Sequence, residues 1–343
     1  MGLLHQPIDK FHDFIGGNMA KPSSIIFQTC GLALLLLGCR GQALAAPGSA
    51  PSQLLGGGKL LLTGGVTQVE GSAGGGLTPW ALIGGNGTDD QIGGSAFYTR
   101  VNLDDYHLDA YGALVGMYNR LELSVSQQRF DTGKPGIIVR SLLGAPTDGG
   151  FALQQTIYGA KVRLFGDAVL DQDRWWPQVA IGVQRKEDNS STEGVAKAVG
   201  AKDGKGTDIY LSATKLYLAQ SLLANVTVRA TKANQFGLLG FGGDKNDGYK
   251  MQVEGSVAYL LRNNLALGAE FRTKPDNLGL ELGGERVLEE NRAFDLFAAW
   301  AVSKNNTLTL AYVDLGRIVS LASKLSGGEE SQRGFYLSSQ YSF

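Results

Sequence analysis

One short stretch of this sequence combines residue types and a spacing that could do acid–base chemistry. Side chains alternate between the two faces of an extended strand, so one face of the stretch 105–111 carries Asp105, His107, Asp109 and Tyr111. An imidazole with carboxylates two residues away on either side could act as a general acid or base. A solvated polar stripe lining a lumen has the same spacing. We favour that interpretation because no esterase or metal-ligand spacing is found elsewhere in the chain.

The cysteine and histidine counts restrict catalysis further. Both cysteines, Cys30 and Cys39, lie in a segment that has the features of a secretory signal. Cleavage after Ala45 would leave a mature chain of residues 46–343 without disulfides, thiolate nucleophiles or cysteine-bound metals. His107 is then the one remaining histidine. We therefore expect no enzyme activity, no cofactor and no metal site.

Residues 1–45 are interpreted as an N-terminal extension followed by this signal peptide. Lys21 supplies the positive charge, residues 25–38 form the apolar core, and Ala43 and Ala45 form a small-x-small cleavage site. Translation begins either at Met1 or at Met19. A rival site exists at residues 36–39, where the sequence LLGC resembles a lipoprotein box and would make Cys39 a lipid-modified N-terminus. A soluble lipoprotein anchored in this way is the competing prediction for the fold.

The composition is poor in charge and rich in glycine. Charged residues make up 18% of the chain, glycine accounts for 49 of 343 residues, and the net charge is −1. Average usage is about 25% charged residues and about 7% glycine. This balance suits a membrane barrel with a polar lumen. No basic face is present, which argues against nucleic acid as a partner.

Alternating apolar and polar residues recur in blocks of about ten from residue 95 onward. Each block is a half-apolar strand of the length that crosses a bilayer at a tilt. Twelve such strands are predicted, near 95–101, 106–117, 119–130, 151–165, 176–186, 207–217, 221–232, 248–260, 264–273, 292–302, 306–315 and 333–343. The Gly-rich segment 46–94 is predicted to be a plug or one more hairpin, so fourteen strands stay possible.

The connections between these strands alternate in length. Tight polar turns near residues 220, 262–264 and 304–306 are separated by long segments at 131–150, 187–206, 234–247, 274–291 and 316–332. Short periplasmic turns and long external loops are typical of outer-membrane barrels. We therefore predict an all-β chain whose residues 95–343 form an antiparallel transmembrane β-barrel in the bacterial outer membrane. Girdles of aromatic residues would include Trp176, Tyr210, Tyr249, Tyr259, Trp300, Tyr312 and Tyr341.

The last strand carries the features expected of a closing strand. Its apolar face presents Phe335, Leu337, Tyr341 and Phe343. In a closed barrel this strand pairs with the first, and its apolar face meets lipid. A terminal Phe after alternating apolar residues resembles the assembly signal of bacterial outer-membrane proteins. The expected partners are thus outer-membrane lipid and the barrel-assembly machinery.

The opposite faces of the strands supply charges of both signs to the interior. The residues predicted to line the lumen are Glu122, Lys161, Arg163, Arg229, Lys250, Glu254, Glu270, Arg272 and Asp295. A lumen of about twelve strands is wider than one of eight strands, which side chains can fill. These charges are consistent with a path for a small polar solute or with pairs that close a filled interior.

The stretch 55–131 contains the segments LLTGGVTQVEG, GGGLTPWALIGG, AFYTRVNLDDYHLDAYGALVG and YNRLELSVSQQRFD. Together these resemble the DUF3034 family of bacterial proteins, and the resemblance extends over most of the mature chain. The resemblance implies an outer-membrane barrel and supplies no activity, ligand or site residues. Three hypotheses stay open: a channel or transporter for a small solute, a structural or surface-interaction barrel acting through its long loops, and a hydrolase using the cluster of Asp105, His107 and Asp109.

Overall fold

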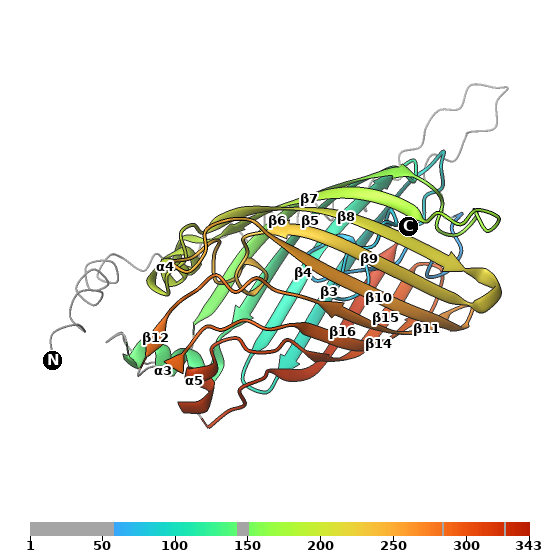
Figure 1. The fold of residues 1–343 in the computed structure, drawn as a ribbon. Coiled ribbons are helices and arrows are strands. Elements are labelled where there is room, and N and C mark those ends of the chain that lie inside the picture. Colours follow the sequence, from blue (N-terminus) through green and yellow to red (C-terminus); the bar gives the residue numbers. More distant parts are fainter. Residues whose placement is uncertain (1–57, 143–150, 283–284, 326) are drawn as a thin grey trace, which may run out of the picture.

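The structure, a computed structural model, describes residues 58–142, 151–282, 285–325 and 327–343. Its main feature is a closed barrel of twelve antiparallel strands (Figure 1). The predicted signal peptide, the choice between Met1 and Met19, and Cys39 all lie outside the described residues. The predicted all-β barrel of twelve strands is confirmed.

The strands follow one another around the barrel in chain order, and the barrel closes where the last strand pairs with the first. The twelve strands are β3 Ile92–Leu103, β4 His107–Met117, β5 Leu121–Asp131, β6 Ala152–Phe165, β7 Gln178–Asp188, β8 Lys205–Tyr217, β9 Leu222–Thr231, β10 Lys250–Arg262, β11 Leu265–Arg272, β14 Ala293–Ala301, β15 Asn306–Asp314 and β16 Arg333–Ser342. Two small hairpins are separate from this sheet: β1 Val66–Thr67 pairs with β2 Ala73–Gly74, and β12 Glu281–Leu282 pairs with β13 Glu285–Arg286.

The sequence alternation sets which side chains face inward. On β5, Leu123 and Val125 are exposed on the outside, whereas Glu122 and Ser126 are only 1% exposed on the inside. The closing strand β16 follows the same rule, because Phe335, Leu337, Tyr341 and Phe343 are exposed while the side chains between them face the interior. An apolar outer face of this kind is what a lipid bilayer stabilises.

The aromatic residues only partly form outer girdles. Tyr259, Trp300 and Tyr341 are exposed on the outer face. The prediction for Tyr210 is wrong: its side chain is 2% exposed and lies inside the barrel. The reason is its register, because Tyr210 shares the inner face of β8 with Ser212 and Thr214.

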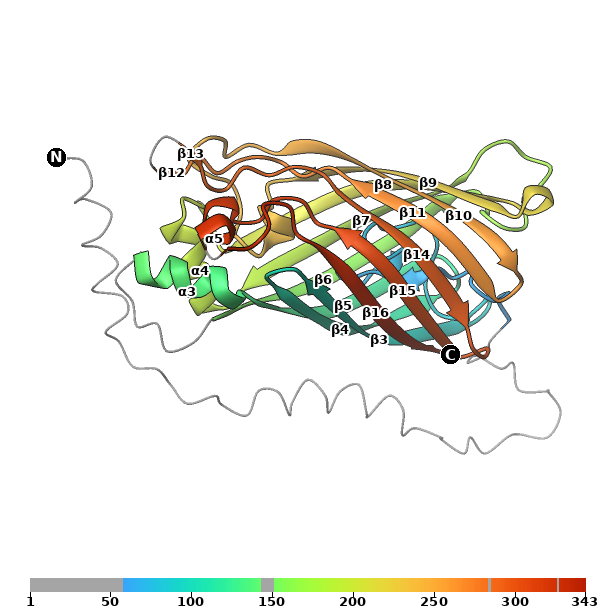
Figure 2. The ribbon, with the colours of Figure 1, turned by 90° about the horizontal axis from the view of Figure 1, so that it is seen from below.

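The two ends of the barrel differ in the length of their connections (Figure 2). One end, which we call the short-turn end, has tight turns at 118–120, 218–221, 263–264 and 302–305. The opposite, long-loop end has segments at 132–151, 189–204, 232–249, 273–292 and 315–332. The rule has two exceptions: 104–106 is a tight turn at the long-loop end, and 166–177 is a longer turn at the short-turn end, held by a hydrogen bond from Gln172 Nε2 to Leu216 O at 2.9 Å.

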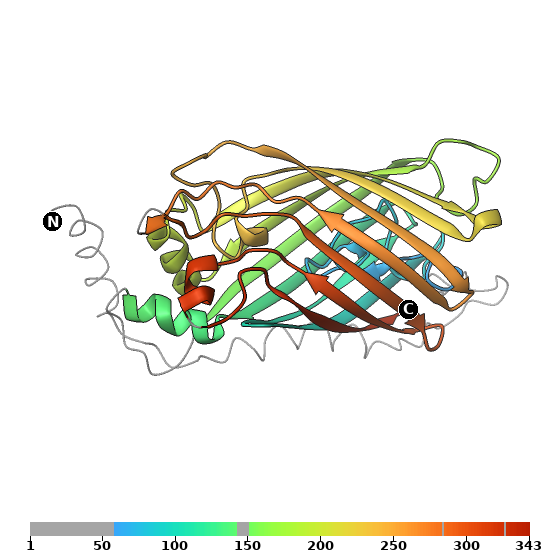
Figure 3. The ribbon, with the colours of Figure 1, turned by 60° about the horizontal axis from the view of Figure 1, so that its bottom comes forward.

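The long loops fold into a cap over their end of the barrel (Figure 3). It contains the helices α3 Gly133–Leu142, α4 Ser190–Ala198 and α5 Ser320–Leu325, and the 3-10 turn η2 Gln235–Gly237. Apolar side chains hold the cap together, including Tyr106, which stacks on Phe130 with ring centroids 5.1 Å apart. Among the described residues, no helix is long and apolar enough to cross a membrane.

Candidate functional site

The segment 58–91, which we call the plug, lies inside the barrel and reaches it from the short-turn end (Figure 3). Wall residues from many strands bind its backbone. The carbonyl of Pro79 accepts hydrogen bonds from Thr227 at 2.8 Å and from Ser212 at 3.2 Å. Trp80 donates its indole N–H to Ser256 at 2.9 Å. The lumen is therefore filled by the protein's own chain.

A buried ion pair on β5 and β6 binds one side of the plug. Lys161 Nζ lies 3.1 Å from Glu122 Oε1, and both side chains are 1% exposed. The ammonium also donates to the carbonyls of Ala73 at 3.0 Å and Trp80 at 3.1 Å. The carboxylate accepts the backbone N–H groups of Ala73 at 3.1 Å and Gly84 at 2.8 Å. The lysine thus binds backbone carbonyl groups of the plug, and the glutamate binds backbone N–H groups of the plug.

Two carboxyl groups on the opposite wall lie at the glycine-rich bend of the plug, and one of them, Glu270, binds it. Glu270 accepts the backbone N–H of Leu77 at 2.7 Å and the hydroxyl of Thr78 at 2.5 Å. Asp295 accepts the hydroxyl of Tyr336 at 2.9 Å. The wall comes so close here that a Cβ atom added to Gly76 would lie 1.9 Å from the Tyr336 hydroxyl oxygen. Only glycine fits this position.

The centre of the lumen contains a cluster of six charged groups. Three are cations on alternate strands, which we call the cation triad: Lys186 on β7, Arg229 on β9 and Arg272 on β11. Two are wall carboxylates, Asp208 on β8 and Glu254 on β10. The sixth is Glu70 of the plug. All six side chains are at most 4% exposed.

Glu70 binds every member of the triad. Its Oε1 accepts from Lys186 Nζ at 2.5 Å and from Arg272 Nη2 at 3.1 Å. Its Oε2 accepts from Arg272 Nη1 at 3.0 Å and lies 3.5 Å from Arg229 Nη2. The contact with Arg272 is thus a two-bond fork, the geometry in which guanidinium groups recognise carboxylates.

A loop from the cap covers the triad on the long-loop side. The ring of Phe236 lies 4.4 Å from Arg272 Cζ, and its carbonyl accepts from Lys186 Nζ at 2.9 Å. Gln235 and Phe236 have positive φ angles of 45° and 62°. Such angles are uncommon for residues other than glycine and mark a backbone held in place by its surroundings.

A second buried pair supports this loop from outside the barrel strands. Lys274 Nζ lies 3.9 Å from Glu290 Oε2, and the Gln235 N–H donates to both Glu290 oxygens at 3.0 Å. Burial raises the pKa of Glu290 to about 7 and lowers the pKa of Lys274 to about 8. The cap therefore contains two groups that titrate near neutral pH.

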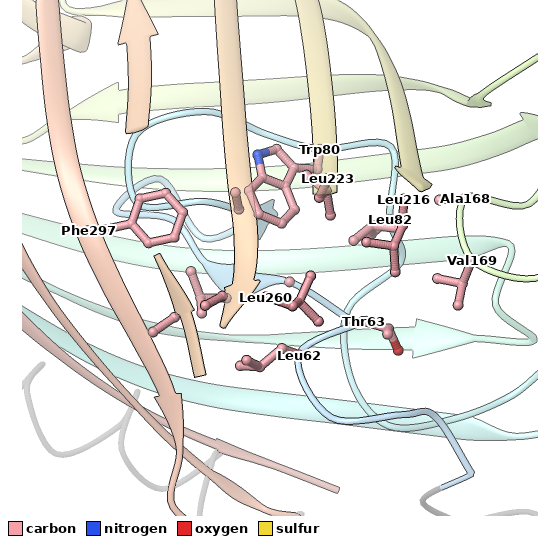
Figure 4. A pocket seen from close by; sticks show the side chains of 15 residues that line it. Leu62, Thr63, Trp80, Leu82, Ala168, Val169, Leu216, Leu223, Leu260 and Phe297 are labelled. Atoms are coloured by element: carbon pink, nitrogen blue, oxygen red, sulfur yellow. The ribbon is translucent and has the colours of Figure 1, made fainter. Parts of the chain in front are cut away.

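The short-turn half of the lumen is apolar where the plug enters. Leu62, Trp80, Leu82, Leu260 and Phe297 line a cavity of about 30 Å³ between the plug and the wall (Figure 4). A cavity of this size has room for about one water molecule. Nearer the mouth lies a polar cavity of about 280 Å³, whose lining includes Lys59, Asn86, Lys304 and Gln340. The larger of these two cavities thus lies at the mouth.

The structure brings together most of the residues predicted to line the lumen. Seven are buried inside the barrel: Glu122, Lys161, Arg229, Glu254, Glu270, Arg272 and Asp295. Arg163 lies at the short-turn mouth, 3.4 Å from Asp167 and 3.6 Å from Asp89 of the plug. Lys250 is exposed at the first position of β10.

The cluster of Asp105, His107 and Asp109 is placed differently from the expectation. His107 is exposed and shares the outer face of β4 with Asp109, so these side chains do not line the lumen. Asp109 accepts the hydroxyl of Tyr98 at 2.6 Å, and Asp105 accepts from Gln332 Nε2 at 2.7 Å. Both carboxylates are engaged by groups other than the imidazole. The physical reason is the register, since Leu108 and Ala110 are the buried, inward-facing residues of this strand.

Sequence reasoning missed three members of the central cluster: Glu70, Lys186 and Asp208. The alternation that places Gln178 and Gln184 inside also places Lys186 inside, so this signal was available. Asp208 has the same parity as the inward residues of its strand. Glu70 lies in a segment without strand periodicity, and no local pattern indicates its partners.

Comparison with known proteins identifies the family. The model of the family described as "Protein of unknown function (DUF3034)" matches residues 63–340. No curated protein matches the chain.

Several solved structures are similar in fold. The KdgM porin has 11% identity, with 73% of this chain and 99% of that chain covered at a TM-score of 0.43. An outer-membrane channel from Pseudomonas putida F1 has 12% identity over 78% and 96% of the two chains, at 0.40. The outer-membrane phospholipase A from Escherichia coli has 9% identity over 72% and 92%, at 0.36. The family match spans most of the sequence, from within the plug to within β16, and the chain belongs to the DUF3034 family.

Proposed function

We propose that this protein is an outer-membrane channel or transporter for a small solute that rests in a closed state, with residues 58–91 as its gate. The observation that carries the proposal is the way the plug is held. It is bound to the lumen wall by ion pairs and hydrogen bonds at Glu122, Lys161, Glu270 and the cation triad. Polar contacts of this kind can be exchanged for contacts with water or a polar solute.

The buried charges favour a solute path through the lumen over a purely structural interior. Removing two charges from water costs several kcal/mol per ion, and well-packed apolar residues are often as stable as a buried ion pair. A barrel that only displayed loops would gain nothing from six charges at its centre. Ionisable groups at membrane depth commonly mark the routes of ions and solutes.

The same proposal includes the surroundings of the barrel. The apolar outer face contacts outer-membrane lipid, and the chain arrives there through a cleaved signal peptide. The barrel-assembly machinery recognises the exposed face of β16, which carries Phe335, Leu337, Tyr341 and Phe343. We also propose that the protein is not an enzyme, since the carboxylates near His107 bind other groups. A His107→Ala variant with lost turnover of any lipid or peptide substrate would contradict this.

A disulfide between plug and wall tests the gate. The hydroxyl oxygens of Thr78 on the plug and Ser256 on β10 are 2.5 Å apart, so cysteines at these positions are placed to form a bond. Residues 46–343 contain no cysteine. In planar bilayers, residues 46–343 with Thr78→Cys and Ser256→Cys are expected to show brief, discrete conductance steps when reduced, each a transient release of the plug from its resting closed position, and none when oxidised.

A matched pair on the wall alone serves as the control. Thr99 and Ser338 are cross-strand partners on β3 and β16 with hydroxyl oxygens 2.7 Å apart. Oxidation of Thr99→Cys with Ser338→Cys links two wall strands and leaves the plug free, so its conductance should not depend on redox state. Silence from folded, inserted, reduced protein in both pairs would contradict the channel.

The runner-up is a surface-interaction barrel acting through its loops. The observation in its favour is that ion pairs hold the loops of the cap together. Arg286 Nη2 lies 2.7 Å from Asp276, and Lys245 Nζ lies 2.5 Å from the same carboxylate. Trimming residues 274–291 would abolish binding to an external partner in this case. A channel would instead keep its conductance steps after the same trimming.

A further inference from the structure

The three cations of the triad all contact one carboxylate of the plug, that of Glu70. We propose that the cation triad is a binding site for the carboxylate group of a small anionic solute, and that Glu70 occupies this site while the lumen is closed. The inference rests on the proposed function, because it names the class of solute for which the plug acts as gate.

The geometry around Glu70 is that of a carboxylate receptor. Arg272 donates from Nη1 and Nη2 to the two different oxygens of the carboxylate, at 3.0 and 3.1 Å. Lys186 donates to one of these oxygens at 2.5 Å, and Arg229 lies 3.5 Å from the other. A planar fork with two flanking cations selects a flat anion with two oxygens over a spherical one such as chloride.

The wall keeps this receptor assembled without help from the plug. Asp208 Oδ2 lies 2.9 Å from Lys186 and 3.3 Å from Arg229. Glu254 contacts Arg229 and lies 3.4 Å from Arg272 Nε. Each cation is therefore positioned by a strand-borne carboxylate, and the triad stays in place when Glu70 leaves.

The charge balance shows what must replace Glu70. The wall contributes three cations and two carboxylates to the cluster, so it carries one uncompensated positive charge by itself. Glu70 supplies the missing negative charge. An empty triad would leave a buried net charge, which is strongly destabilising. One carboxylate from a solute restores the balance that one carboxylate of the plug provides.

A neighbouring buried amide on the wall extends the site beyond a bare anion. Gln184 accepts from Arg229 Nη1 at 2.6 Å, and its Nε2 has no hydrogen-bond partner among the described residues. This free donor suits a hydroxyl group, so a hydroxycarboxylate fits the site better than a simple fatty acid.

Competition between solute and plug follows from this arrangement. Glu70 is tethered to the barrel, and a tethered group acts at an effective concentration in the millimolar range for a short flexible link. A free carboxylate therefore has to reach at least millimolar concentration to displace it. Displacement releases the plug at its central anchor and leaves the solute bound on the path.

Planar-bilayer recordings at equal ionic strength test the proposal, with residues 46–343 in potassium chloride, potassium acetate or potassium gluconate. We expect the open fraction to be at least tenfold higher in gluconate than in chloride, with acetate between them. Glu70→Gln removes the tethered anion and should be open in chloride. Arg272→Met should lose the difference between the salts, while Arg100→Met, an exposed arginine on the outer face of β3, should keep it.

A labelling measurement gives a second readout that does not need conductance. Val69 is buried beside Glu70, so a Val69→Cys thiol reports release of the plug through its rate of reaction with a soluble maleimide. The rate should rise at least tenfold in gluconate, and heat-dependent gel mobility verifies that each variant is folded. Arg272→Lys keeps the charge without the fork and should retain only part of the response.

The outcomes separate the two proposals. Equal open fractions and equal labelling rates in gluconate and chloride overturn the carboxylate site, even when the reduced Thr78→Cys and Ser256→Cys protein conducts. A protein that neither conducts nor becomes labelled in any salt, including with Glu70→Gln, overturns the channel itself.

Discussion

At the scale of single residues, the lumen depends on charges that have partners on both the wall and the plug. Lys161 and Glu122 form such a pair, with every described contact of the ammonium made to Glu122 or to the plug. Replacing only one partner would leave the other charge buried without compensation. The cost of that change is about 3–5 kcal/mol in buried pairs.

We therefore predict that Lys161→Met lowers the free energy of unfolding by about 3–5 kcal/mol. The double variant Lys161→Met with Glu122→Gln should recover part of this loss, because neither charge is then buried alone. Guanidinium unfolding of vesicle-inserted protein measures both. Equal losses in the single and double variants would show that packing, and not the ion pair, sets the stability here.

Another residue-scale requirement is the close approach at Gly76. A Cβ atom there would lie 1.9 Å from the Tyr336 oxygen and 3.1 Å from Asp295 Oδ2. We predict that Gly76→Ala prevents the plug from seating and raises the open fraction in planar bilayers at least tenfold, while the wall stays folded. Gly255→Ala is the matched control on β10, since its nearest atom would be 3.7 Å away. A closed Gly76→Ala protein would mean that the plug bends without losing its contacts.

At the scale of elements, the sequence predicts the strands and offers a plug as one of two interpretations of segment 46–94, but it does not predict the contacts of the plug. Each predicted strand overlaps an observed one, because alternation over ten residues is a property of the local sequence. Residues of the central cluster such as Lys186 and Asp208 follow from the same alternation once the strand ends are known. Glu70 does not, because its partners are more than 100 residues away in the chain. Such contacts depend on barrel closure, which no local pattern encodes.

The cap is an element whose stability should depend on pH. Burial raises the pKa of Glu290 from 4.5 to about 7, so the folded cap holds this proton more tightly than the unfolded chain does. Its stabilising effect is present below pH 4.5 and is lost as the pH rises to about 7. Burial lowers the pKa of Lys274 from 10.5 to about 8, so its contribution is present above pH 10.5 and is lost as the pH falls to about 8.

We thus predict that the cap is least stable between pH 7 and 8, where both groups are charged. Hydrogen exchange at the Gln235 amide, which donates to Glu290, measures cap opening after correction for the intrinsic pH dependence of exchange. Glu290→Gln should remove the change between pH 4.5 and 7 and leave the change above pH 8. If the change in exchange between pH 4.5 and 7 persisted in this variant, another group would be responsible for it.

At the scale of the whole molecule, two leucines with nearly the same exposed fraction are expected to lie in different media, one in lipid and the other in water. Leu310 lies at the middle of β15 between Ala298 and Leu337, and 56% of it is exposed. Leu325 lies on α5 in the cap and is 58% exposed. In water, arginine at either position would cost little, because surface substitutions usually change stability by less than about 0.5 kcal/mol. In a bilayer, the cost of an arginine on the lipid face is about 2–4 kcal/mol at the midplane.

We predict that Leu310→Arg lowers the unfolding free energy in lipid vesicles by about 2–4 kcal/mol, whereas Leu325→Arg changes it by less than about 0.5 kcal/mol. The comparison separates the effect of the surrounding medium from the effect of exposure, because the two side chains have nearly the same exposed fraction. Guanidinium titration of each variant in the same vesicles gives the two values. Equal costs would place the middle of β15 in water, and the apolar belt would then need another explanation than contact with lipid. A large cost confined to Leu310 would instead show that lipid contact, and not exposure alone, accounts for the outward alternation of apolar residues on the strands.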